Sequence, residues 1–306
     1  MNFINKHKIM LSVIFILIII ASFGIYRYKN MKANNIKAFE YQIELCETGY
    51  YDSFEDVSKE NYCALMEEGL NNAKVKEDTI WLFFNLIDDY PIWYLQIFGI
   101  FLVIIPAIYV FNNELKSEYY KNILMRMEYD KYIKKSILSS YKYALIFPIF
   151  LLCLFCASYI ISGHFDLIST LQIKPNTLHT NEIFINNMLL FLITYFINMF
   201  LHGILWINLS YMVVKKSKNF ILTIILTFML YIGIEVVFQI FIGQIPQIFG
   251  IGKNIINYVM MFNIWNYKNV DNIFIKLLMT IIYLLISFTL LKIIYKNKEE
   301  VIIENE

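Results

Sequence analysis

Few side chains that could do chemistry lie inside the long apolar stretches of this 306-residue chain. Glu235 lies within one stretch, and Gln239 follows four residues later, so a helix carries both on one face. A carboxylate at membrane depth costs about 2.5–3.5 kcal/mol on insertion scales, so Glu235 is expected to face protein or a wet cavity. Two interpretations stay open: a translocation-path residue, or a structural carboxylate paired with Lys276 or Lys253. His202, in another stretch, is either a path residue or a hydrogen-bonded packing residue.

Sequence motifs for catalysis are missing. The chain has no GxxxxGK[ST] phosphate loop, no HExxH and no GxSxG. An intramembrane enzyme generally needs several ionisable groups at one depth, and Glu235 and His202 are the two that we count inside the apolar stretches. We therefore expect no enzymatic activity, no metal and no cofactor in this chain. Any ATP-driven work requires another subunit that binds ATP and Mg.

The elements that position these residues are six apolar stretches, each about as long as the 17–25 residues that a helix needs to cross the hydrocarbon core. They lack the alternation of barrel strands, which leaves helices as the spanning structure. The sequence therefore predicts an all-α polytopic membrane protein with six transmembrane helices. The predicted spans are Ile9–Tyr26, Ile92–Phe111, Tyr143–Ser162, Met188–Val213, Phe220–Ile242 and Ile273–Tyr295.

The composition agrees with this class. Hydrophobic residues make up 58% of the chain and charged residues only 17%, below the roughly 25% of soluble domains. No nucleic-acid-binding signature accompanies the net charge of +1, so we expect the lipid bilayer and no nucleic acid as a partner. The first stretch exceeds the usual h-region of a signal peptide, which favours a retained anchor helix over a cleaved leader.

Lysine and arginine predict the orientation, because short positive loops stay cytoplasmic. Basic residues gather in the loops after the second and fourth spans and after the sixth, and Lys6 and Lys8 share that side. The predicted protein is thus a multi-pass plasma-membrane protein with both termini in the cytoplasm. Its parts are residues 1–29 with the first span, an extracytoplasmic segment 30–91, and residues 92–306 with the other spans and a cytoplasmic loop 112–142. Basic residues after the first span break the rule locally, but the rest of that segment is acidic.

The extracytoplasmic segment is expected to form short helices, with Ser53, Ser58 and Thr79 as candidate N-caps. Cys46 and Cys63 both fall in it, and an oxidising compartment permits a disulfide between them. Two free thiols are the open alternative, since spacing alone does not fix pairing.

A second external region, residues 243–272, is too apolar for a simple loop, and Pro246, Gly250 and Gly252 interrupt it. This pattern is typical of short re-entrant or interfacial helices packed against protein. An ordinary external loop is the alternative.

The loop between the second and third spans carries apolar residues at helical spacing with basic residues between them, which predicts amphipathic helices with a break near Met127. A basic helix that only binds anionic lipid is one interpretation.

This loop resembles that of the membrane subunits of type-2 ABC exporters, in which a Glu opens the loop and a Lys-x-x-Leu stretch and a basic turn follow. The matching residues are Glu114, Lys121, Leu124, Arg126 and Lys135. Glu118 and Met127 depart from the pattern, because a Gly and a Pro are usual there. The six spans and the region 243–272 are also similar to that family.

The resemblance implies that residues near 114–127 form a coupling helix that docks on a separate ABC ATPase. It also implies a second permease copy or a paralogue. The apolar interior allows a lipid, a drug or an antimicrobial peptide as the transported molecule, and the sequence does not select among them. The alternative function is a membrane sensor or immunity protein whose external segment binds a ligand.

Overall fold

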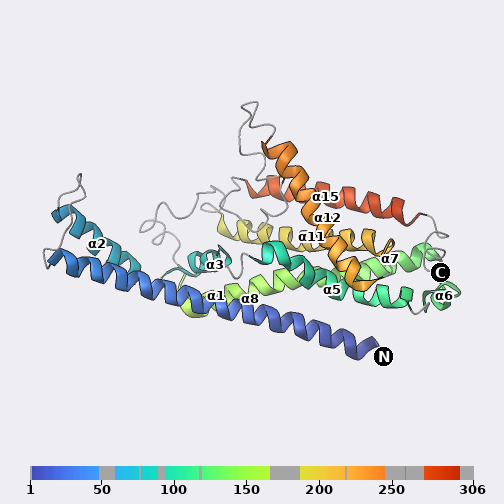
Figure 1. The fold of residues 1–306 in the computed structure, drawn as a ribbon, viewed down its shortest axis with the longest axis horizontal. Coiled ribbons are helices and arrows are strands. Elements are labelled where there is room, and N and C mark those ends of the chain that lie inside the picture. The colour runs from blue at the N-terminus through green and yellow to red at the C-terminus, as the bar shows by residue number, and fades with distance from the viewer. Residues whose placement is uncertain are drawn as a thin grey trace. The chain divides into compact units, whose positions relative to one another are not determined.

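The computed structural model describes residues 2–47, 59–75, 77–88, 94–116, 119–165, 187–217, 219–244, 259 and 272–296. These residues form helices joined by turns and short irregular segments (Figure 1). Six of the helical segments are long and apolar enough to cross a membrane, which confirms the predicted all-α class with six candidate spans. The elements are α1 (Asn2–Glu47), α2 (Lys59–Lys74), α3 (Thr79–Asp88), α5 (Leu95–Lys116), α6 (Tyr119–Leu124), α7 (Tyr129–Ser140), the 3-10 helix η1 (Tyr141–Leu145), α8 (Ile146–Ser162), α11 (Met188–Val214), α12 (Phe220–Phe238), the π-helix η2 (Gln239–Gln244) and α15 (Ile273–Ile294).

Asparagine caps the N-terminus of three of the spanning helices. The side chains of Asn187, Asn219 and Asn272 accept hydrogen bonds from backbone N–H groups in the first turns of α11, α12 and α15, at 3.3, 3.0 and 2.9 Å. A short polar side chain at this position satisfies a backbone donor that has no partner within the helix. The caps therefore explain why these helices begin at the edges of the apolar runs.

The first helix is longer than the sequence analysis predicted. α1 continues through residues 27–47 without interruption, whereas short separate helices were expected after Tyr26. The reason is local: residues 27–47 contain neither Gly nor Pro, so nothing in the chain breaks the helix after the apolar run ends. The 46 residues of α1 extend roughly 69 Å, more than twice the thickness of a hydrocarbon core.

The chain divides into two compact units, and the first comprises residues 1–17, 93–152 and 179–306. α11 is the central helix of this unit and packs against α5, η1, α12 and α15. Its closest approach is at Gly203, where an added Cβ would lie 2.9 Å from the Cα of Ala144 in η1. A glycine is required at this position because the two backbones leave no room for a side chain.

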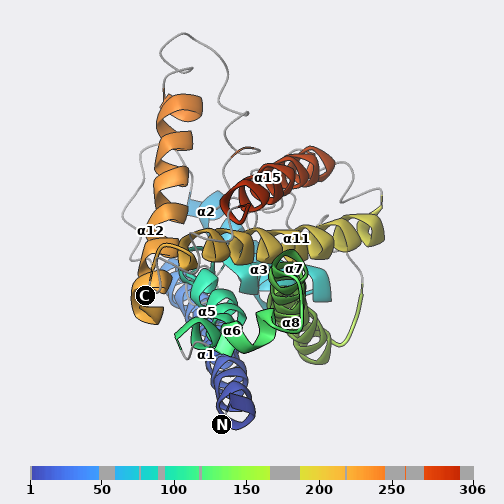
Figure 2. The ribbon, with the colours of Figure 1, turned by 90° about the vertical axis from the view of Figure 1, so that its right-hand side faces the viewer.

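Within this unit α12 crosses α11 steeply, while α15 runs beside α11 (Figures 1 and 2). The Asn208 side chain donates to Ser287 at 2.8 Å, and the Tyr295 hydroxyl donates to the Tyr211 carbonyl at 2.7 Å, so α11 and α15 are joined along their length. Aromatic rings join α12 to α5, with Phe228 4.8 Å from Phe101 between centroids.

The second unit comprises residues 18–92 and 153–178. In it α3 is almost wholly buried and packs on the end of α8, with Phe83 and Phe155 edge to face at 5.4 Å. The Asp78 side chain, rather than Thr79, caps α3 by accepting from the Ile80 N–H at 2.8 Å. Thr79 is the first helical residue instead, and its hydroxyl lies against Ser162 and the His164 carbonyl, so it joins α3 to α8.

Several predictions fall on residues outside the described ranges. These are the caps at Ser53 and Ser58 and, apart from residues 243, 244, 259 and 272, the predicted re-entrant region 243–272. Lys253, one of the two partners considered for Glu235, also lies outside the described residues.

Candidate functional site

The loop between the second and third spans folds into two helices, α6 and α7, separated by a turn at residues 125–128. This turn agrees with the break predicted near Met127. Glu128 precedes α7 in extended conformation, with φ of −60° and ψ of 144°, which ends the helical path of α6 and redirects the chain. α7 then continues directly into η1 and α8, so the loop is connected to a spanning helix on this side without a linker.

Glu114 connects the beginning and the end of this loop. The Tyr132 hydroxyl in the first turn of α7 donates a 2.8 Å hydrogen bond to the Glu114 carboxylate in the last turn of α5. Tyr132 is buried and its ring lies 6.0 Å from Phe111 of α5. A hydrogen bond to a carboxylate is stronger than one between neutral groups. The end of α5 and the beginning of α7 are therefore held together.

A second set of hydrogen bonds joins α7 to α11. The Tyr211 hydroxyl lies 2.7 Å from the Ser140 hydroxyl and 3.1 Å from the Ser136 hydroxyl, and the Ser140 hydroxyl also donates to the Ala107 carbonyl of α5 at 3.0 Å. Tyr211 and Ser140 are buried. A displacement of α7 therefore acts on both α5 and α11.

A cavity of about 190 Å³ lies behind the turn. Glu114, Lys135, Ser136 and Tyr211 supply its polar wall, and Ile123 is among the apolar residues on the other side.

The four residues predicted to couple to an ATPase differ in exposure. Glu114 is half-buried and bonded to Tyr132, whereas Arg126 is exposed at the tip of the turn beside Met125, which is 78% exposed. Lys121 and Leu124 are half-buried on α6. A surface hollow of about 500 Å³ lies along residues 122–127. Glu114 is thus partly covered, whereas Arg126 is on the exposed side of the loop.

A second candidate site is a buried polar cluster in the first unit. It consists of His202 of α11, Glu235 of α12 and Lys276 of α15, which are 2%, 1% and 3% exposed. Lys276 lies within electrostatic range of Glu235, and His202 lies within electrostatic range of Lys276. Three ionisable groups from three helices therefore lie near one another, and Lys276 is the predicted candidate partner of Glu235 that the structure describes.

Aromatic rings enclose this cluster. The His202 ring lies edge to face with Trp206 at 4.8 Å and with Tyr231 at 6.3 Å. Gln239 was expected on the same helical face as Glu235, but it is exposed while Glu235 is buried. Gln239 lies at the end of α12, where its backbone N–H still bonds to the Glu235 carbonyl, and the π-helix η2 begins there. Gln239 is therefore not part of the cluster.

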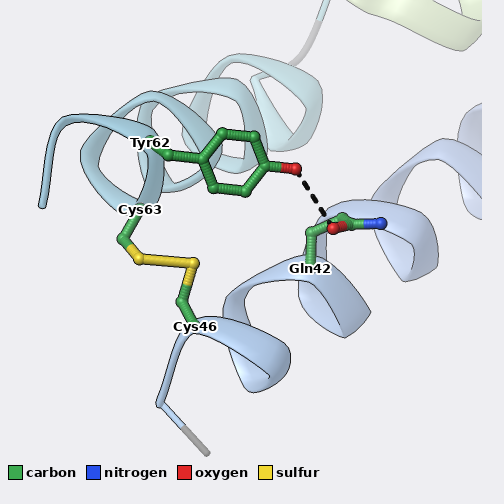
Figure 3. The surroundings of a disulfide bond; sticks show 4 residues. All are labelled: Gln42, Cys46, Tyr62 and Cys63. Carbon is green, nitrogen blue, oxygen red and sulfur yellow. Dashed lines mark hydrogen bonds between the residues drawn. A yellow bond between two sulfur atoms is a disulfide. The ribbon is translucent and has the colours of Figure 1, made fainter. Parts of the chain in front are cut away.

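In the second unit, a disulfide joins Cys46 near the end of α1 to Cys63 of α2, with the Cα atoms 6.0 Å apart (Figure 3). This is the bridged alternative of the sequence analysis. The Tyr62 hydroxyl donates to the Gln42 side chain at 3.1 Å next to it, and the Lys74 ammonium group lies 3.0 Å from the Glu40 carboxylate. An added Cβ on Gly69 would meet the Phe39 ring at 2.6 Å, so the two helices approach closely there. We call this pair of helices, residues 27–47 and 59–74, the stapled arm.

Among the described residues no group of three or more His, Cys, Asp or Glu side chains is placed to hold a metal ion. Comparisons of the chain with protein-family models, with curated proteins and with solved structures found no match. The fold and the sites described above are therefore the basis for a function.

Proposed function

We propose that this chain is the permease subunit of an ATP-driven exporter of the type-2 ABC class. In this proposal the turn between α5 and α7 docks on a separate ATPase, which binds ATP and Mg. A second permease copy or a paralogue completes the translocation path. Both termini and the turn lie in the cytoplasm, and the protein resides in the plasma membrane.

The observation that carries the proposal is the construction of the turn. It is short, closed by the Glu114–Tyr132 hydrogen bond, and joined to α5 and α11 through Ser140 and Tyr211. At the same time it presents Met125 and Arg126 outward. An element that is rigidly attached to several spanning helices and exposed at its tip is suited to receive a mechanical displacement from a partner.

The proposed mechanism follows from these attachments. A push on the tip at Arg126 moves α6 and α7 together, because their ends are closed by Glu114 and Tyr132. α7 continues into η1, whose Ala144 is in backbone contact with Gly203 of α11. The motion therefore reaches α11, which carries His202 of the buried cluster. A shift of α11 changes the position of His202 relative to Glu235 and Lys276, which we propose as the polar part of the path.

Co-purification is the test. The tagged full-length chain is purified in a mild detergent from the cells that naturally contain it, and the co-purified proteins are identified. We expect an ATPase with a phosphate-binding loop, and hydrolysis of ATP by the purified complex. Arg126→Glu is expected to lower the recovery of the ATPase. Lys134→Glu changes an exposed charge on α7 away from the tip, and as the matched control it is expected to leave this recovery unchanged. Recovery of the chain without any such ATPase would overturn the proposal.

The stapled arm supports a second candidate function. A sensor or immunity protein needs a rigid external element, and a disulfide-joined helix pair is such an element. This function predicts that the purified chain alone binds an extracellular peptide or lipid-like ligand. It also predicts that Cys46→Ser with Cys63→Ser abolishes that binding, with no ATPase involved.

A further inference from the structure

A groove of about 610 Å³ lies between α11, α12 and α15 of the first unit. Leu205, Leu209 and Met212 form its floor on α11, Gly233 lies on its α12 wall, and Leu290 lies on its α15 wall. Its volume is within the range of about 300–1,000 Å³ that is usual for ligand pockets. All three helices are candidate membrane spans.

Most of the side chains that line the groove are apolar. Ser287 is a polar residue in its lining, but the Ser287 hydroxyl already accepts from Asn208 at 2.8 Å and donates to the Leu284 carbonyl at 2.8 Å. Gly233 leaves the α12 wall open, because an added Cβ there would meet no atom within 4 Å. The apolar side chains around an empty space lose dispersion contacts, and a hydrocarbon chain in the groove would restore them.

The two ends of the groove differ. At one end the rings of Phe238 and Tyr283 stack at 5.6 Å and close it. At the other end Lys216 lies in the turn that follows the last residue of α11, four residues after Met212, and it is exposed. Lys292 and Lys296 are also exposed at the adjoining end of α15. The Lys215 ammonium group donates to the Ile294 carbonyl at 2.6 Å, which shows that these two helix ends lie together.

We propose that this groove binds one anionic membrane lipid, with an acyl chain along α11 and the headgroup at Lys216. Lysines at the end of a span attract anionic headgroups. A helix from a second copy fits the groove less well. Residues 205–212 and 283–290 each extend about 10 Å along their helices. Over that length a helix of about 10–12 Å diameter occupies roughly 800–1,200 Å³, which is more than the 610 Å³ of the groove. This site does not depend on the proposed ATPase partner.

The test uses the purified full-length chain in vesicles that contain spin-labelled phosphatidylglycerol or spin-labelled phosphatidylcholine. We expect the wild-type protein to immobilise phosphatidylglycerol preferentially. Gly233→Phe fills the groove and is expected to reduce the preference to that of ordinary surrounding lipid. Ile225→Phe, an exposed position on α12 outside the groove, is the matched control and is expected to leave it unchanged. Lys216→Gln is expected to lower the preference about fivefold, and Lys134→Gln to leave it unchanged.

Equal immobilisation of the two lipids by the wild-type protein would overturn the proposal. The proposal would also be overturned if a folded Gly233→Phe protein kept the wild-type preference for phosphatidylglycerol. It would be overturned as well if Gly233→Phe lost association between two copies of the chain and kept its lipid binding. Leu290→Trp fills the groove from α15 and supplies the same comparison if Gly233→Phe does not fold.

Discussion

The Tyr132 hydroxyl donates a hydrogen bond of 2.8 Å to the Glu114 carboxylate, and this contact closes the loop between α5 and α7. It makes the loop one structural element. The proposed coupling depends on this closure, because an open loop would absorb a displacement at its tip instead of passing it to α5 and α11.

Removing that hydrogen bond tests its contribution. Tyr132→Phe keeps the ring beside Phe111 but removes the hydroxyl that donates to the half-buried Glu114 carboxylate, so the free energy of unfolding is expected to fall by about 1–3 kcal/mol. Unfolding in mixed micelles measures it. Tyr26→Phe, on an exposed tyrosine of α1, is the control and is expected to have no effect. Equal stability of the two variants would show that the contact does not hold the loop.

Two glycines in the first unit are expected to respond oppositely to alanine. Gly203→Ala places a methyl group 2.9 Å from the Ala144 backbone, so it should cost about 1–3 kcal/mol of stability. Gly233→Ala meets no atom within 4 Å and gains helix propensity, so it should be neutral or stabilising by up to about 1 kcal/mol. Thermal melting in detergent measures both. A tolerated Gly203→Ala would mean that α11 and η1 are not in close backbone contact.

The interaction between Lys276 and Glu235 in the buried cluster can be tested by removing their charges. Lys276→Met removes the cation that acts on Glu235 and leaves a buried carboxylate without it, so a loss of about 3–5 kcal/mol is expected. The double variant Lys276→Met with Glu235→Met should recover much of that loss. Lys292→Met, on the exposed side of the same helix, is the control and should change little. Independent, additive effects in the double-mutant cycle would contradict an interaction between the two groups.

The disulfide of the stapled arm can be tested by the reactivity of the cysteines. Of the four cysteines, only Cys153 and Cys156 should react with an alkylating reagent in denaturing detergent without reductant, as mass spectrometry would show. Cys46→Ser with Cys63→Ser should destabilise the arm by about 3 kcal/mol and raise hydrogen exchange in α2. Exchange in α11 serves as the internal reference and should not change. Alkylation of all four cysteines in the unreduced protein would disprove the bridge.

The spans could be predicted from the sequence because the signal is a long apolar run, which needs no knowledge of neighbours. α11, α12 and α15 begin where the runs begin, since Asn187, Asn219 and Asn272 cap them. The extension of α1 past Tyr26 was missed because its polar residues were interpreted as a loop, although nothing in residues 27–47 breaks a helix.

The sites were harder to predict, since they depend on which faces meet. Lys276 was considered only as an end-of-span partner, and its burial depends on how α12 and α15 both pack against α11, which α12 crosses steeply (Figure 2). Gln239 keeps the predicted helical spacing from Glu235 but is exposed at the end of α12, whereas Glu235 is buried, and its predicted place in a path stays a prediction. The Glu114–Tyr132 contact depends on the turn at residues 125–128, which brings together two side chains that are far apart in any single helix.

Site-specific photo-crosslinking from the tip of the turn is the most direct test of the central claim. A photoreactive amino acid replaces Arg126 in the full-length chain, in the membranes of the cells that naturally contain it, and a second protein carries the same group at the exposed Ile225 of α12. We predict that position 126, and not position 225, forms a covalent product with an ATPase that carries a phosphate-binding loop. Crosslinking of position 126 only to lipid, or labelling of position 126 by a membrane-impermeant reagent applied outside intact cells, would contradict the account.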